Sequence, residues 1–200
     1  VLKLKITPAA NLNGLVDENS QVITLNIGNS TSDNLDIIFD WGVDREYTGL
    51  DEATHSFADF DFDLEIYAGA SPVLASYSSA PEAIEFLSSY PDGTYTIVAS
   101  FWDASTAAEP MLPINFTPTL TVTKKGVFER SFDLTGVWNS AIGGNEQGNV
   151  NAYLDVAYFT KTGSIFQLYD MDDNLLVTGK SGAVKNAIKN ISKARKGGRK

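Results

Sequence analysis

Apolar and polar residues alternate with a period of two through most of the first 180 residues, in short runs separated by Gly, Pro, Asn and Asp. This alternation is typical of half-buried β-strands joined by tight turns. No helical repeat separates the runs, which favours antiparallel pairing over βαβ units. The pattern therefore predicts an all-β fold, an antiparallel β-sandwich of jelly-roll type. Strands are expected at residues 2–6, 21–28, 35–41, 59–67, 73–78, 84–88, 93–102, 117–123, 127–134, 151–159, 164–170 and 174–178.

Two longer stretches interrupt the alternation. Residues 103–116 contain Pro110 and Pro113 and predict an irregular connection, whereas residues 136–150 are rich in Gly and Asn and predict a long loop. Long loops on a β scaffold often carry the functional residues. Residues 1–180 are expected to form one sandwich domain. The alternative is a boundary near 136–150 that separates a small C-terminal hairpin unit.

The hydrophobic period changes at the C-terminal end. Apolar residues from Val184 to Ala194 recur at helical spacing, Ser181 is a suitable N-cap, and two glycines at 197–198 end the pattern. Residues 181–200 are therefore predicted to form a short basic amphipathic helix and tail. Such a helix is marginal alone in water and needs a surface to pack on.

Charge is distributed unevenly along the 200 residues. Residues 1–179 carry seven Lys and Arg against 25 Asp and Glu, a net charge of −18, and the remaining residues carry +8. An acidic body repels nucleic acid and anionic lipid, so neither is an expected partner except for membrane contact through the basic tail 183–200. No apolar run approaches 18 residues, which predicts no membrane-spanning helix. The absence of cysteine excludes disulfides and thiolate chemistry.

Four carboxylates share one side of the segment "DFDFDLEIY" at 59–67: Asp59, Asp61, Asp63 and Glu65. Alternate residues of a strand share a face, so Phe, Leu and Ile lie on the opposite side. Three interpretations stay open. The acidic side is a solvated face that discourages edge pairing, a docking face for the basic tail or another cation, or a Ca²⁺ site. The Ca²⁺ site would use Asp59, Asp61 and Asp63, with loop ligands from Asp33, Asp36, Asp103 or Asp170.

The three tryptophans are candidates for ligand binding, because sugar faces stack on exposed aromatic rings. Trp41 and Trp102 end predicted strands, and Trp138 lies in the Gly/Asn-rich loop, which makes it the leading candidate. The competing interpretation is burial, the usual location of aromatic side chains in a sandwich.

Enzymatic chemistry has little support in the sequence. His55 is the single histidine and lies in a polar stretch, so it is predicted to be a surface residue. There is no Gly-x-Ser-x-Gly elbow and no zinc-ligand spacing. A glycoside hydrolase needs only two carboxylates in a cleft, which 25 acidic residues could supply by chance. Such a cleft would lie between loops 103–116 and 136–150.

Residues 59–123 contain three spaced motifs, "DFDLEIY" at 61–67, "GTYTI" at 93–97 and "TPTLTVT" at 117–123. The positions that matter are Asp61, Asp63, Leu64, Ile66 and Tyr67, then Gly93, Thr94, Tyr95 and Ile97, and finally Leu120 and Val122. In this layout, residues 59–123 resemble the bacterial pre-peptidase C-terminal domain. That resemblance implies a jelly-roll-like sandwich on exported bacterial proteins, non-catalytic, with some members binding Ca²⁺ or a polymeric substrate. It implies a cation role for Asp61 and Asp63. Pro72 and the 103–116 insertion depart from the pattern, and residues after 126 have no counterpart.

The function expected from these observations is that of a non-catalytic bacterial domain outside the cytoplasm: periplasmic, cell-surface or secreted. It would bind a glycan or a protein, with Ca²⁺ as a candidate stabilising ion. One alternative is a glycan-active hydrolase that uses a carboxylate pair. Another is a structural adhesin or fimbrial-type subunit that assembles through strand edges.

Overall fold

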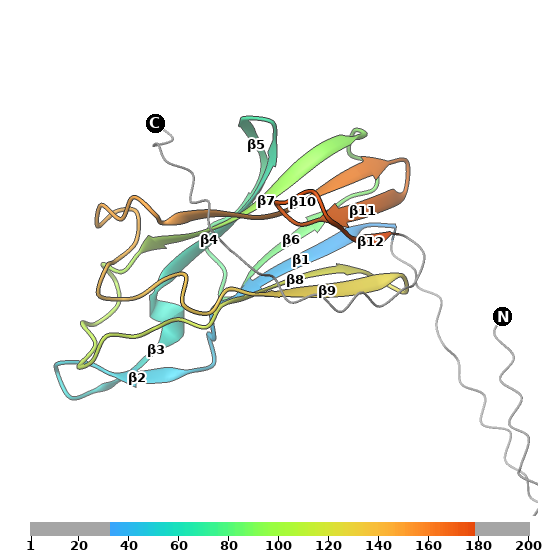
Figure 1. Cartoon of the computed structure of the whole chain (residues 1–200). Helices are drawn as coiled ribbons and strands as arrows, with labels where there is room; N and C mark the ends of the chain where they lie inside the picture. The colour runs from blue at the N-terminus through green and yellow to red at the C-terminus, as the bar shows by residue number, and fades with distance from the viewer. Residues whose placement is uncertain (1–32, 179–200) are drawn as a thin grey trace, which may run out of the picture.

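The computed structural model describes residues 33–178, which form two antiparallel sheets packed against each other (Figure 1). The four-stranded sheet has the order β6-β1-β8-β9 and the six-stranded sheet the order β12-β11-β10-β7-β4-β5; β2 and β3 form a separate hairpin. The strands are β1 (Leu35–Asp40), β2 (Glu46–Thr48), β3 (Thr54–Ser56), β4 (Asp61–Ala68), β5 (Ser71–Ser76), β6 (Glu82–Phe86), β7 (Gly93–Asp103), β8 (Thr119–Lys124), β9 (Phe128–Asp133), β10 (Tyr153–Thr162), β11 (Ile165–Tyr169) and β12 (Leu175–Thr178).

The all-β prediction is confirmed for the described residues. Each strand predicted between residues 35 and 178 corresponds to an observed one, with ends displaced by a few residues. Helical structure there is limited to one 3₁₀ turn, η1 (Phe57–Asp59), and no helix in this range could cross a membrane. The strands predicted at 2–6 and 21–28, and the helix predicted within 181–200, lie outside the described residues.

The strands on both sides of loop 136–150 belong to the same sandwich. β10 pairs antiparallel with β7 along most of its length, with a register shift between Asp155 and Ala157, and β7 pairs in turn with β4. The chain that follows the loop therefore extends the six-stranded sheet.

The inward faces of the two sheets supply the core. On β4, Phe62, Leu64 and Ile66 are fully buried, which confirms the apolar side predicted for this strand. Leu35 and Ile37 of β1 are equally buried and belong to the same core from the opposite sheet. Burying one such side chain stabilises the fold by roughly 1.5–3 kcal/mol.

Aromatic rings fill one end of this core. The Trp41 and Phe62 rings stack at 5.0 Å between centroids, and Trp138 packs edge-on to Phe62 at 5.7 Å. Both indole N–H groups donate to backbone carbonyls, Trp41 to Phe57 at 2.8 Å and Trp138 to Ala152 at 2.9 Å. Each tryptophan is 1% exposed. The expectation that Trp41 or Trp138 presents a ring to a ligand is therefore wrong, because packing covers both faces and the N–H is already bonded.

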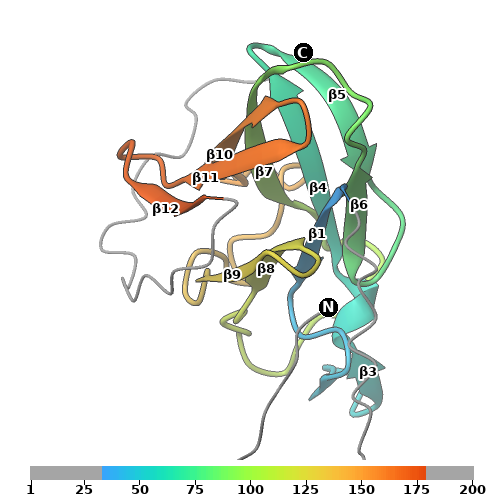
Figure 2. The ribbon, with the colours of Figure 1, turned by 90° about the vertical axis from the view of Figure 1, so that its right-hand side faces the viewer.

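The β2–β3 hairpin lies at one end of the sandwich, beside the connection 103–116 (Figures 1 and 2). Gly49 forms a bridge with Pro110, and the Met111 N–H donates to the Thr48 carbonyl at 2.9 Å. The irregular connection is thereby attached to the outer edge of β2. This contact brings β2 and residues 111–115 side by side.

Candidate functional site

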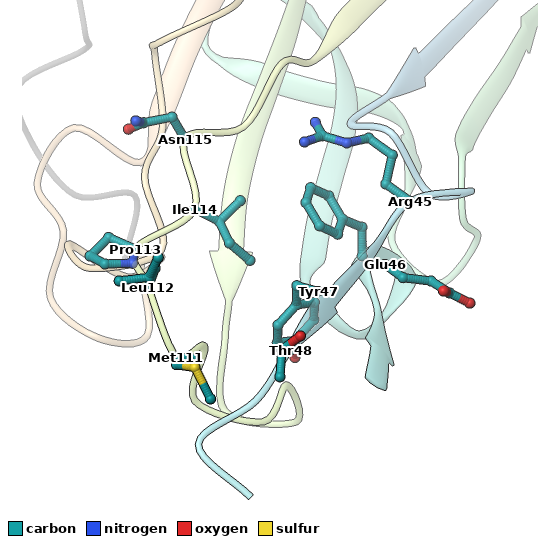
Figure 3. A pocket seen from close by; sticks show the side chains of 10 residues that line it. Arg45, Glu46, Tyr47, Thr48, Met111, Leu112, Pro113, Ile114 and Asn115 are labelled. Atoms are coloured by element: carbon teal, nitrogen blue, oxygen red, sulfur yellow. The ribbon is translucent and has the colours of Figure 1, made fainter. Parts of the chain in front are cut away.

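A surface groove of about 430 Å³ separates β2 from the segment 111–115 (Figure 3). Arg45 and Asn115 lie at one end, Thr48 and Met111 at the other, with Ile114 facing the hairpin across the middle. Ligand sites in proteins commonly occupy concave surfaces of this size. The lining residues are Arg45, Glu46, Tyr47, Thr48, Phe57, Met111, Leu112, Pro113, Ile114 and Asn115.

The groove opens because Pro113 cannot continue a strand pairing. The Gly49–Pro110 bridge sets a register in which Thr48 faces Met111 and Glu46 faces Pro113. Alternate residues of β2 direct their N–H and C=O to the same edge, so the Glu46 groups point toward the groove as those of Thr48 do. Proline has no N–H to donate. Within residues 33–178 no backbone hydrogen bond joins Glu46 to this segment.

Apolar atoms supply slightly more than half of the groove surface. Phe57 and Tyr47 are buried beneath it, and the Tyr47 hydroxyl donates to the Ala108 carbonyl at 2.9 Å. Burial is the main cause of a raised pKa for Tyr47, which keeps this phenol neutral. On the opposite wall, Leu112 is 76% exposed and Met111 is 49% exposed. Two large apolar side chains therefore remain in water directly beside a concave apolar surface.

Arg45 is a positioned cation at one end of the groove. Its guanidinium carbon lies 4.4 Å from the centroid of the Phe57 ring, and Nη1 donates to Thr117 Oγ1 at 3.0 Å. Gly42 has a φ of +90°, and a Cβ there would lie 2.8 Å from Cδ of Arg45, so only glycine leaves room for this rotamer. No carboxylate of residues 33–178 forms an ion pair with Arg45.

The sequence did not single out Arg45, Leu112 or Met111. The available signal was Pro110 and Pro113 within a connection that interrupts the strand pattern. That signal correctly marked 103–116 as irregular, but it could not show which segment the connection would face.

The predicted acidic side of 59–67 is not a solvated face. On β4, Asp63 is 6% exposed and Glu65 is 8% exposed. Two tyrosine hydroxyls donate to Glu65: Tyr77 to Oε1 at 2.7 Å and Tyr67 to Oε2 at 3.0 Å. The expectation of open solvent is therefore wrong for Asp63 and Glu65, whereas Asp59 and Asp61 are half-buried.

Burial also changes the ionisation of this face. Desolvation, reinforced by the nearby carboxylates of Asp61, Glu65 and Glu82, raises the pKa of Asp63 to about 8. Desolvation, followed by the charge of Asp103, raises the pKa of Asp61 as well. Asp63 is therefore largely protonated at neutral pH, and the face carries less negative charge than its composition indicates.

The three carboxylates proposed for Ca²⁺ do not converge. Asp59 lies in η1, where its Oδ2 accepts the Ser56 N–H at 3.3 Å in a capping box. Asp61 faces Asp103 across the β4–β7 pair. Among the described residues no group of three or more His, Asp or Glu is arranged to hold a metal ion. Calcium needs six to eight converging oxygens, so this part of the chain gives the Ca²⁺ prediction no support.

The remaining predicted residues lie apart from the groove. Trp102 is half-buried at the end of β7, with its ring edge-on to Tyr153 at 6.5 Å. His55 on β3 pairs with Asp51 at 3.0 Å near the surface. The groove lining holds one carboxylate, Glu46, whose side chain points away from Ile114 (Figure 3). A hydrolase that needs two acids finds no such pair in this groove.

Comparisons of the chain with protein-family models, with curated proteins and with solved structures found no match. The function is therefore inferred from the residues of the groove.

Proposed function

We propose that this protein is a non-catalytic binding domain whose groove between β2 and residues 111–115 holds an extended, apolar segment of a partner protein. The observation that carries the proposal is the exposure of Leu112 and Met111 beside an apolar groove. Side chains of this kind remain in water at a cost, which a bound apolar segment would remove.

The backbone of β2 favours an extended ligand. Thr48 pairs with Met111, but this pairing stops before Pro113, which faces Glu46. The outward N–H and C=O of Glu46 therefore face the groove. An incoming extended segment can hydrogen-bond to a strand edge of this kind while its side chains contact the groove walls. Backbone pairing then supplies affinity, and the apolar walls select the side chains.

A protein segment suits the groove better than a glycan. Sugar rings bind to open aromatic faces, but Phe57 and Tyr47 are buried and Trp41 and Trp138 are in the core. Trp102 is the one predicted platform that keeps partial exposure, and it does not line the groove. A glycan site at Trp102 is the second candidate function.

The proposal retains the jelly-roll type and the bacterial, extracytoplasmic location expected from the resemblance of residues 59–123 to the pre-peptidase C-terminal domain. The two packed antiparallel sheets support the fold expectation at the level of a β-sandwich. The location rests on the resemblance alone.

A random twelve-residue peptide library displayed on phage tests the proposal. Peptides selected on the domain are synthesised, and their affinities are measured by fluorescence anisotropy. We expect selected peptides to be rich in aliphatic residues and Leu112→Ser to weaken their binding about tenfold, the effect of losing one buried aliphatic contact.

Ile165→Ser is the matched control, because Ile165 is 58% exposed and begins β11, away from the groove lining. Its affinity should equal that of the unmodified domain. Selected peptides that bind both variants alike, or a library without any binder, would overturn the proposal. A glycan array with binding lost in Trp102→Ala and kept in Leu112→Ser would favour the second candidate.

A further inference from the structure

Arg45 is the one charged side chain directed along the groove, and it forms no ion pair with a carboxylate of the described residues. Residues 33–178 contain five Lys and Arg against 23 Asp and Glu. Lys161, for comparison, pairs with Asp92 at 2.9 Å. Lys124 and Lys125 also form no ion pair with a described carboxylate, and Arg45 differs from them in lying at the end of a groove, where a carboxylate from outside can reach it.

The guanidinium is held in place before any ligand arrives. The Phe57 ring lies beneath it, Thr117 accepts one N–H, and Gly42 leaves space for the side-chain stem. An arginine has five N–H donors in a planar fork, so donors remain for a carboxylate after the bond to Thr117. A cation positioned in this way loses little conformational entropy on binding.

Neighbouring charges do not occupy the position. Glu46 follows Arg45 in sequence, but its carboxylate points away from the groove (Figure 3). Asn115 lies at the same end as Arg45 and adds a neutral polar group to the lining. The groove therefore combines an apolar length with one polar, cationic end.

We infer that Arg45 determines specificity by binding an Asp or Glu side chain of the extended segment, at a fixed position from the aliphatic residues that contact Leu112. This inference rests on the proposed function and adds the chemistry of the ligand. The ligand needs both the carboxylate and the aliphatic residues. A carboxylate alone is repelled by the acidic surface of this protein, and an aliphatic segment alone leaves the N–H donors of Arg45 unused.

A double-mutant cycle on the peptides selected above tests the inference. Each peptide is made with an amidated C-terminus, and its acidic residue is changed to the matching amide. We expect this change to weaken binding to the unmodified domain about tenfold and to leave binding to Arg45→Gln unchanged. For Arg45→Lys the loss of affinity should be intermediate, because lysine keeps the charge but lacks the planar pair of N–H donors.

Lys125→Gln removes the same charge from the exposed β8–β9 turn and should preserve the tenfold ratio. Thermal unfolding confirms that each variant is folded. Two results would overturn the inference and leave the proposed function standing. The first is a set of peptides that depend on Leu112 but have no acidic residue at a fixed position. The second is an acid-to-amide change that weakens binding to Arg45→Gln as much as binding to the unmodified domain. Peptides insensitive to Leu112→Ser would overturn both.

Discussion

The Tyr77 hydroxyl donates a 2.7 Å hydrogen bond to Oε1 of Glu65, across the edge between β5 and β4. Tyr67 donates to the other carboxylate oxygen from the same strand as Glu65. A carboxylate that is 8% exposed is thereby supplied with two donors. The two hydrogen bonds replace part of the hydration that the Glu65 carboxylate loses on this covered sheet face.

Tyr77→Phe should lower the free energy of unfolding by about 1–2 kcal/mol, because it removes one donor from a nearly buried carboxylate. Urea denaturation at neutral pH provides the measurement. Tyr90→Phe is the control, since the Tyr90 hydroxyl has no hydrogen bond within residues 33–178. Equal stabilities of the two variants would show that Tyr77 contributes nothing to Glu65.

Asp63 should make stability depend on pH in an unusual direction. Its folded pKa of about 8 exceeds the unfolded value, so the folded state retains a proton that the unfolded state has lost between about pH 4 and 8. The contribution of Asp63 is fully present below that range and declines as pH rises toward 8. Asp63→Asn removes the dependence and should stabilise the protein at pH 9 by roughly 2–4 kcal/mol.

Chemical denaturation at pH 5, 7 and 9 measures this effect as the difference between Asp63→Asn and the unmodified protein. Asp172→Asn, at an exposed turn position, should show no such trend. A difference that stays constant with pH would contradict the burial of Asp63.

Gly144 attaches loop 136–150 to the end of β7. A Cβ there would lie 2.4 Å from the Trp102 carbonyl oxygen, closer than real contacts allow, and the obstructing atom belongs to the backbone. Gly144→Ala should therefore destabilise the fold by about 2–3 kcal/mol in thermal unfolding. Gly93→Ala, whose nearest contact is 3.6 Å from Tyr95, should change stability by less than about 1 kcal/mol. Similar melting temperatures for the two would show that the loop does not lie against β7.

The buried tryptophan of this loop supports a separate prediction. Trp138→Ala should cost about 3–5 kcal/mol, because the indole is fully packed and its N–H is bonded to Ala152. Trp102→Ala should cost clearly less, since Trp102 is only half-buried. Denaturant titration of both variants checks the order, and a smaller loss for Trp138 would restore it as a candidate surface residue.

The strand pattern was predictable because alternation reports which side of a strand faces the core. On β4, the parity of Phe62 and Leu64 identified the inward face correctly. The state of the opposite face was not predictable, since it depends on Tyr77, which follows the neighbouring strand β5. A polar sequence pattern indicates which way a side chain points, but not what covers it.

The groove was even less accessible from sequence. β2 and β3 have three residues each, too short to show a period of two. Gly49, directly after β2, bridges Pro110, about 60 residues later in the chain. The composition of 103–116 marked it as irregular, but the position of Arg45 beside this segment follows from tertiary contacts alone.

Amide chemical-shift mapping by nuclear magnetic resonance tests the binding groove most directly. A selected peptide is titrated into the ¹⁵N-labelled domain. We expect the largest shifts at Glu46 and Thr48 on β2 and at Leu112 and Ile114 across from it, with the outer face around Tyr77 and Asp63 unchanged. Shifts centred on that outer face or on Trp102, with Glu46 and Ile114 unmoved, would contradict the proposal that this domain binds its partner between β2 and residues 111–115.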